Sequence, residues 1–280
     1  MENYKYTKNF DKKSLKILIA SDIHLAIDNI KKLGETLERK IDEIDYVFLP
    51  GDLCNFDPKN CDNSELVSAC EGEMSSVISA FENIFYKKTI YLPGNHDAKT
   101  TLLNDVKPKL TSFSENIHKQ CFRIHNDIVM VGLGGSLPGY QDGKERWVGY
   151  PYQSEDQVEK DLKSTVQAGK DSGLIKETDK ILLFTHMGPY YSATTIDQVE
   201  SPSSPIYSGS KSINSFILAN QSKILLSIHG HTHHSLGMNR VGKTYVVNPG
   251  SLRTGHYAIL TLEKYLNELW RVKSTEYHIL

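Results

Sequence analysis

The chain has 280 residues, of which 39% are hydrophobic and 24% charged, a balance that excludes disordered, collagen-like and coiled-coil proteins. The formal net charge is −2 and cations never run beyond a pair, so duplex nucleic acid and anionic lipid are not expected partners. The polar start and the lack of a long apolar run predict a cytoplasmic protein without a membrane segment. The length suits one domain, residues 1–280; composition leaves the oligomeric state open.

Short apolar runs alternate with segments whose apolar residues recur at three- and four-residue steps, which predicts an α/β fold. In chain order the predicted elements are strand 15–20, helix 30–44, strand 46–49, helix 66–85 entered through Asn63 or Ser64, strand 89–92, a helix opened by a capping box of Ser154 and Gln157, strands 181–184 and 224–228, and strand-like runs at 244–247, 257–262 and 268–272. Because no long helix separates the last runs, we expect a second, more antiparallel sheet there.

Several segments fall outside this alternation. Residues 1–13 are interpreted as an N-terminal extension, and about 134–153 and 187–212 as loops at the rim of a site. Segment 237–244 matches the phosphate-loop pattern literally, but it leads into a strand and a Pro-Gly turn instead of a helix. A hairpin turn is therefore the better interpretation of that segment.

Polar side chains follow five of the predicted strands, at the point where each strand ends. These residues are Asp22 and His24 after the first strand, Asp52 after the second, Asn95, His96 and Asp97 after the third, His186 after the fourth, and His231 and His233 after the fifth. Ligands of open α/β sheets bind outside the carboxyl ends of the strands. We therefore expect these side chains to meet at one rim of the molecule.

The types of these residues indicate a metal site. Asp22 and His24 stand two residues apart, as do His231 and His233, so in an extended segment each pair projects to one side. Imidazoles and carboxylates without thiolates suit Zn²⁺, Mn²⁺ or Fe. Seven donors exceed the needs of one tetrahedral ion, which favours a pair of ions. A single His after a strand is more often structural, and a lone Asp there is usually a cap, but five His at strand ends favour ligation.

The five segments together resemble the signature of the calcineurin-like metallophosphoesterases. Asp-x-His, Gly-Asp, Gly-Asn-His-Asp, a separate His and Gly-His-x-His occur in this order from Asp22 to His233. Segment 248–251, Asn-Pro-Gly-Ser, is similar to the phosphodiesterase branch of that superfamily. The resemblance implies two mixed β-sheets packed face to face with helices on the outside, a four-layer αββα sandwich. It also implies metal-dependent hydrolysis of phosphate esters.

Roles follow from the resemblance, motif by motif. It implies one ion held by Asp22, His24, Asp52 and His233, and a second held by Asp52, Asn95, His186 and His231. The ions would be Mn, Fe or Zn, and a hydroxide between them would attack phosphorus. His96 would protonate the departing alkoxide as the general acid, and Asp97 would orient His96.

Departures from the pattern narrow the expected substrate. The protein phosphatase branch carries Asp-Arg-Gly after its Gly-Asp, whereas no Arg follows Gly51-Asp52 here, and the later motif ends in Asp97 instead of Glu. We therefore expect a small-molecule or nucleotide phosphodiester. The alternatives are a phosphomonoesterase acting on a small organic phosphate, and a non-catalytic scaffold similar to the retromer subunit of this fold. A nuclease similar to the double-strand-break repair enzymes would need a basic groove that the composition does not indicate.

The Gly- and aromatic-rich rim segment 134–153 carries candidate substrate contacts. Tyr140 would stack on a base or ring, and Arg146 would approach the phosphate. A packed surface loop with no role in binding is the competing interpretation.

Overall fold

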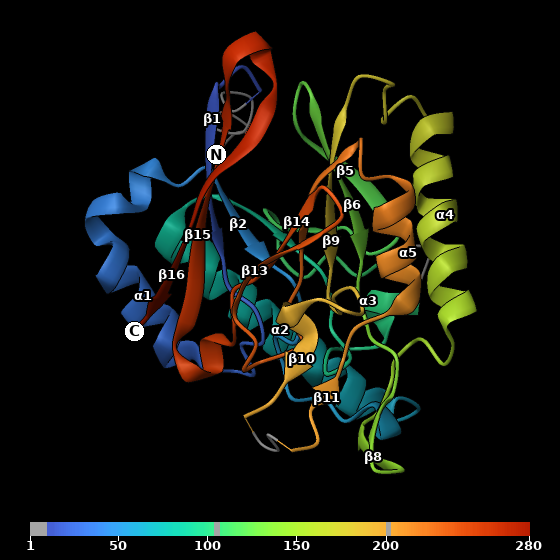
Figure 1. The fold of residues 1–280 in the computed structure, drawn as a ribbon. Coiled ribbons are helices and arrows are strands. Elements are labelled where there is room, and N and C mark those ends of the chain that lie inside the picture. The colour runs from blue at the N-terminus through green and yellow to red at the C-terminus, as the bar shows by residue number, and fades with distance from the viewer. Residues whose placement is uncertain (1–9, 104–106, 200–202) are drawn as a thin grey trace.

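Two six-stranded mixed sheets form the framework of the protein (Figure 1). The computed structural model describes residues 10–103, 107–199 and 203–280. The first sheet has the order β16-β15-β1-β2-β3-β4, from Trp270–Ile279, His256–Lys264, Ser14–Ile19, Tyr46–Leu49, Lys88–Tyr91 and Glu115–Asn116. The second has the order β13-β14-β12-β9-β6-β5, from Gly237–Val241, Thr244–Asn248, Ile224–Ile228, Lys180–Thr185, Ile128–Leu133 and Gln120–His125.

Helices cover the outer faces of both sheets, as Figure 1 shows. The helices are α1 (Ile27–Leu37), α2 (Ser64–Phe85), the short α3 (Thr100–Leu103), α4 (Glu155–Asp171) and α5 (Lys211–Ala219). Apolar residues of α1 and α2 pack on the first sheet, and those of α4 and α5 on the second. A third apolar cluster fills the space between the sheets. This arrangement confirms the predicted sandwich of two mixed sheets between helices.

Strand β1 shows how the sequence builds these layers. Leu15, Ile17 and Ile19 point into the cluster between the sheets, while Leu18 packs under the helices. Both faces are buried, because alternate side chains of a strand point to opposite faces and each face is covered. A strand in which every residue of 15–20 except Lys16 is apolar and buried is the result.

Several local predictions are confirmed. Asn63 caps α2 by accepting hydrogen bonds from Glu65 N and Leu66 N, and Ser154 with Gln157 forms the capping box of α4. The segment with the literal phosphate-loop pattern is the hairpin of β13 and β14, paired antiparallel from Gly237–Asn248 to Val241–Thr244.

Other predicted boundaries are wrong. The helix expected over 30–44 ends at Leu37 and is followed by a 3-10 helix, Glu38–Glu43. No residue of this 3-10 helix is buried. The last strand begins at Trp270, after a 3-10 turn at Leu266–Glu268, and reaches Ile279 instead of ending near 272. Strands β5 and β6 and helix α5 were not among the predicted elements.

The expected separate antiparallel sheet at the end of the chain does not form. Strands β13 and β14 extend the second sheet, with β14 parallel to β12, while β15 pairs antiparallel with β1 in the first sheet. Antiparallel β15 covers the edge of β1 that the parallel strands leave unpaired.

The two rim segments contain small sheets of their own. Segment 134–153 holds the hairpin of β7 (Gly139–Gln141) and β8 (Lys144–Trp147). Segment 187–212 holds a 3-10 turn, Ala193–Thr195, and the pair of β10 (Ile196–Asp197) and β11 (Ile206–Tyr207). Residues 1–9 of the expected extension and 200–202 of the second loop lie outside the described residues. Over the described ranges, no helix is long and apolar enough to cross a membrane.

Candidate metal centre

The loops that follow β1, β2, β3, β9 and β12 bring the predicted polar residues together. Two groups of donors result, and within each group the donor atoms lie within 4.8 Å of one another. The first group is Asp22, His24, Asp52 and His233, and the second is Asp52, His186 and His231. Asp52 belongs to both groups. The structure thus places the predicted donors in two adjacent clusters that share one carboxylate.

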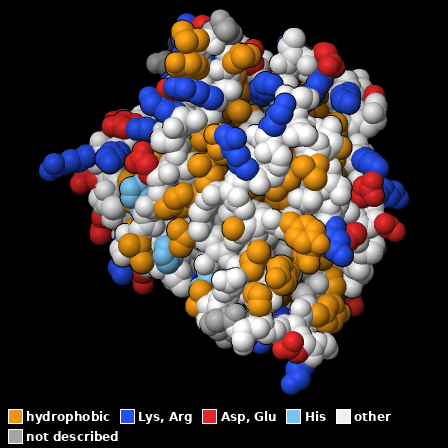
Figure 2. Space-filling model, viewed as in Figure 1, with side chains coloured by type: hydrophobic (Ala, Val, Ile, Leu, Met, Phe, Trp, Pro, Cys, Tyr) orange, Lys and Arg blue, Asp and Glu red, His pale blue; other side chains and the backbone are white. Residues whose placement is uncertain are grey.

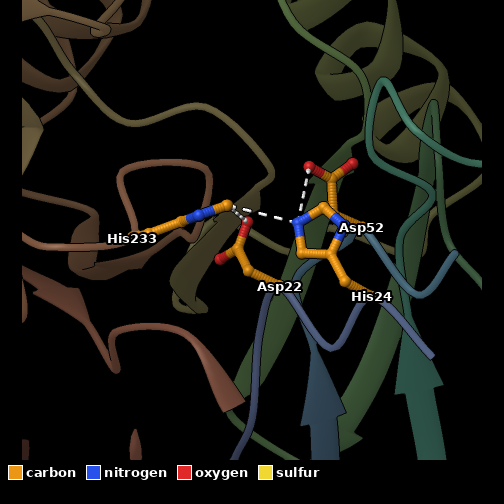
Figure 3. Close-up of side chains that lie close together, drawn as sticks. All are labelled: Asp22, His24, Asp52 and His233. Carbon is orange, nitrogen blue, oxygen red and sulfur yellow. Dashed lines mark hydrogen bonds and ion pairs between the residues drawn. The ribbon is translucent and has the colours of Figure 1, made fainter. Parts of the chain in front are cut away.

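The first cluster faces inward on a common point, as Figure 3 shows. His24 Nε2 lies 3.2 Å from His233 Nε2 and 3.8 Å from Asp52 Oδ2, and His233 Nε2 lies 3.3 Å from Asp22 Oδ1. The other ring nitrogen of His24, Nδ1, donates to the carbonyl of Cys54 at 3.1 Å or to Asn55 Oδ1 at 2.9 Å. The lone pair of His24 Nε2 therefore points into the cluster.

The second cluster has the same construction. His186 Nδ1 donates to the carbonyl of Pro50 at 2.8 Å, while its Nε2 lies 3.4 Å from Asp52 Oδ2 and 3.2 Å from Asn95 Oδ1. Asn95 thus completes this group, as predicted. The Nε2 atom of His231 is buried and has no hydrogen-bond partner among the described residues.

The donors reach these positions through left-handed backbone. The φ angles are 51° at Asp22, 49° at His24, 53° at Asp52 and 67° at His231. The expectation that Asp22 and His24 project together from an extended segment is therefore wrong. Ile23 N and His24 N both donate to the carbonyl of Asp52, and these bonds hold the strained turn.

Two glycines make room for the donors, one for Asp52 and one for His186. A Cβ atom on Gly94 would lie 2.1 Å from Asp52 Oδ1. Gly51 has a φ of +113°, and its Cβ would lie 2.4 Å from His186 Nδ1. Only glycine permits this close approach of backbone and donors.

Segment 248–253 braces the centre from the far end of the chain, a role that sequence reasoning missed. Asn248 Nδ2 donates to the carbonyls of Thr232 at 2.8 Å and Thr194 at 3.2 Å. Ser251 Oγ donates to the carbonyl of Asp22 at 2.8 Å, and the Asp22 carboxylate accepts from His231 N. The Asn-Pro-Gly-Ser motif signalled a relative of phosphodiesterases but not these contacts.

Burial and neighbouring charges shift the pKa values of the donors. Burial favours the neutral form of Asp52, but His186, His96 and His24 together outweigh it and hold the pKa of Asp52 well below its usual range. Burial likewise opposes the charge of His186, yet Asp52 raises the pKa of His186 to about 9. Burial lowers the pKa of His231 to about 3 and also lowers the pKa of His24. Neutral His231 and His24 are in the form that binds a cation.

His96 lies at the cavity beside the clusters, but Asp97 does not orient it. The Nδ1 atom of His96 donates to the carbonyl of Phe56 at 3.0 Å. The carboxylate of Asp97 instead accepts from Cys54 N at 2.9 Å and Gly94 N at 2.8 Å. Among the described residues no hydrogen bond joins the two side chains, so the predicted role of Asp97 is wrong. Asp97 ties the loop after β2 to the loop after β3.

A cavity of about 260 Å³ opens over the clusters. Its lining residues are Asp52, His96, Arg146, Trp147, Asp197, Ile206, Ser208, His231, Thr232, His233 and His234. Arg146 therefore lies where a substrate contact was expected. Tyr140, the other expected contact, is 61% exposed and does not line the cavity, since it belongs to the far strand of the β7–β8 hairpin. Trp147 takes its place, with its ring 5.0 Å from that of His231.

These donors fit a pair of divalent cations. Two imidazole nitrogens face each other at 3.2 Å, and the buried His231 Nε2 finds no partner in the described part of the chain, arrangements that a cation would satisfy. Imidazole, carboxylate and amide donors are typical of Zn, Mn and Fe sites. Asp52 would contribute to the binding of both ions, because it belongs to both clusters.

Comparison with known proteins agrees with this geometry. Residues 10–271 match the family model of the calcineurin superfamily of metallophosphoesterases. The chain belongs to this superfamily. An uncharacterised protein of Methanocaldococcus jannaschii is 27% identical over 238 residues, which cover 85% of this chain and 88% of that protein.

Solved structures share the fold at low sequence identity. A protein of Thermus thermophilus has a TM-score of 0.58 and 17% identity, covering 95% of this chain and 98% of that one. A dimetal phosphatase from Danio rerio has a TM-score of 0.55 and 10% identity, with the same coverage of 95% and 98%. At these identities the likeness concerns the fold alone.

Proposed function

We propose that the protein hydrolyses a small phosphodiester with two divalent ions of Mn, Fe or Zn. The observation that carries this proposal is the pair of donor clusters sharing Asp52. Asp22, His24, Asp52 and His233 would hold one ion, and Asp52, Asn95, His186 and His231 the other. When bound, such ions lower the pKa of water and neutralise charge on a phosphate.

The protein's own groups supply the remaining steps. His96 lines the cavity, and its Nδ1–H is held by the Phe56 carbonyl, so Nε2 is the atom that delivers a proton to the leaving oxygen. Arg146 on the rim would contact the phosphate or a second anionic group of the substrate.

A small diester suits the cavity better than a phosphoprotein. The volume of about 260 Å³ accommodates a small organic group, and strand pairs stand on two sides of the cavity. On the face of the molecule seen in Figure 2, basic and acidic side chains are interspersed around the margin, which does not favour duplex nucleic acid.

Two substitutions separate proton transfer from metal binding. His96→Asn is expected to lower kcat for an ester with a poor leaving group by about 10²–10⁴-fold while metal content stays unchanged. Asp52→Asn is expected to lose both metal and activity, because it alters both clusters. The measurements are the metal content of each variant and its turnover of bis-p-nitrophenyl phosphate and p-nitrophenyl phosphate. A methyl ester is assayed beside them, because its poorer leaving group depends more on the general acid.

The same substrates distinguish the alternatives. Faster turnover of the diester supports the proposal, and faster turnover of the monoester identifies a phosphomonoesterase. A metal-loaded wild type that hydrolyses neither ester would be a scaffold. Full activity of Asp52→Asn would refute the assignment of the centre.

A further inference from the structure

A pair of cysteines lies outside the metal centre, and the proposed function gives it no role. The Sγ atoms of Cys54 and Cys70 and a carboxylate oxygen of Glu73 lie within 4.8 Å of one another. Cys54 follows β2 in the loop that also carries Asp52, whereas Cys70 and Glu73 belong to α2. Two thiols from different elements therefore meet in the apolar layer between α2 and the first sheet.

Both thiols of this pair are free and enclosed. All four cysteines of the chain are free, and Cys54 and Cys70 are 0% and 2% exposed. Cys54 Sγ donates to the carbonyl of Cys70 at 3.7 Å, so the Cys54 thiol is directed at the helix. Glu73 is exposed and stands three residues after Cys70 on the same side of α2, so it marks where the pair approaches solvent.

The two sulfurs are close enough to be joined by a small movement. A disulfide bond is about 2.05 Å long, so the sulfurs must close a gap of less than about 3 Å. Cys70 is held in α2, whereas Cys54 lies in a loop, so Cys54 is the partner that moves. Formation of the bond would therefore draw the loop after β2 toward α2.

The backbone of this loop supports the metal centre. The carbonyl of Cys54 accepts from His24 Nδ1 at 3.1 Å, and Cys54 N donates to Asp97 Oδ1 at 2.9 Å. Two residues further on, the carbonyl of Phe56 accepts from His96 Nδ1 at 3.0 Å. A shift of the loop would displace a partner of a metal donor and a partner of the general acid. Loss of partners that orient metal ligands typically costs about 10–100-fold in metal affinity or activity.

We propose that Cys54 and Cys70 form a reversible disulfide on reaction with a peroxide, and that this bond weakens the metal centre. One thiol attacks hydrogen peroxide, breaks its O–O bond and becomes a sulfenic acid with release of one water. The other thiol attacks the sulfenic sulfur and releases a second water, so the two thiols together give up two electrons and two protons. Enclosure of both sulfurs favours this small oxidant over a bulky disulfide. The bond itself is independent of the proposed function, but its effect on turnover rests on that function.

The test uses a Cys61→Ala/Cys121→Ala double variant, in which only this pair of thiols remains. The zinc-loaded protein is treated with hydrogen peroxide, and catalase then removes the excess; zinc is chosen because it has no redox chemistry of its own. The intact mass is expected to fall by about 2 Da, the two hydrogens lost, with the peptides of Cys54 and Cys70 linked. Turnover of bis-p-nitrophenyl phosphate is expected to fall by about 10–100-fold. Dithiothreitol should reverse both changes, and peptide mapping of the oxidised wild type should show the same linkage.

Cys70→Ala in the same background is the matched control, since it removes the partner thiol and leaves the loop of Cys54 intact. It should keep its turnover and zinc content after peroxide treatment. Two thiols that still react with iodoacetamide after unfolding, or that gain oxygen without linking, overturn the disulfide. A linked protein with unchanged turnover and zinc content, or an equal loss in Cys70→Ala, overturns its effect on the centre. Failure of the reduced, zinc-loaded protein to hydrolyse any ester overturns the proposed function and leaves the result on linkage standing.

Discussion

His118 is a fully buried imidazole that lies outside the metal centre. Its Nδ1 atom accepts a hydrogen bond from Gly134 N at 2.9 Å, which requires that nitrogen to be unprotonated. Burial, reinforced by Lys107 and Lys119, lowers the pKa of His118 well below 6.5. The folded protein therefore holds this residue neutral, while the unfolded chain takes up a proton as the pH falls below 6.5.

The free energy of unfolding should therefore decrease as the pH falls below about 7.5. Between pH 7.5 and 5.5, His118 is expected to remove about 1.4 kcal/mol from the free energy of unfolding. His118→Gln keeps an acceptor for Gly134 but cannot titrate, so its loss over the same interval should be smaller by that amount. Urea unfolding of both proteins at the two pH values measures the difference. Equal losses would contradict the prediction.

For single residues, the sequence predicted where the donors lie but not all of their contacts. Asp52, His186 and Asn95 converge as expected, because the carboxyl ends of strands from both sheets meet at one rim of the molecule. Sequence order cannot show which atom a side chain reaches, so Asp97 was assigned to His96 although backbone amides occupy it. For the same reason Tyr140, and not Trp147, was predicted as the aromatic contact with substrate.

The β7–β8 hairpin packs Trp147 closely against the candidate metal centre. Trp147 Nε1 donates to the carbonyl of Leu137 at 2.9 Å. A Cβ atom on Gly139 would lie 2.1 Å from Trp147 Cζ2, a separation that side chains do not tolerate. The ring must move if Gly139 gains a methyl group, and it contacts His231.

Gly139→Ala is therefore expected to lower kcat/KM by roughly tenfold, the equivalent of about 1.4 kcal/mol, within the usual range for overpacking. Gly72→Ala is the matched control. Gly72 lies inside α2 with nothing within 4 Å of an added Cβ, so that variant should keep wild-type kinetics. It should also gain roughly 0.5–1 kcal/mol of stability from helix propensity. Steady-state kinetics and urea unfolding test both, and wild-type kinetics for Gly139→Ala would contradict the first expectation.

Elements were predictable where burial is periodic. Helix α2 buries Val67, Cys70, Met74 and Phe81 at helical spacing, and its range was predicted closely. The 3-10 helix at Glu38–Glu43 buries none of its residues, so periodicity could not define where α1 ends. Edge strands such as β5 are half-buried and give weak patterns.

In the whole molecule the donors come from both sheets. Asp52 follows β2 of the first sheet, whereas His186 follows β9 of the second. A cation bound by both would link the two halves of the sandwich and stabilise the folded state by mass action, about 4 kcal/mol at a thousandfold excess over Kd.

Removal of metal should therefore lower the stability of the entire protein. A chelator is expected to lower the Tm by on the order of 10 °C, given about 2–4 °C per kcal/mol in large domains. Asp52→Asn, which lacks the shared carboxylate, should melt at the same temperature with and without chelator. Differential scanning calorimetry on both proteins measures this, and an unchanged wild-type Tm would argue against metal in the folded state.

The bracing of Asp22 by the end of the chain has a consequence for biosynthesis. The carbonyl of Asp22 accepts from Ser251 Oγ and Arg253 N, and its carboxylate from His231 N. A ribosome must therefore translate more than 250 of the 280 codons before the earliest donor has its final supports. Shorter nascent chains lack these supports, so the geometry around Asp22 is completed only near the end of synthesis.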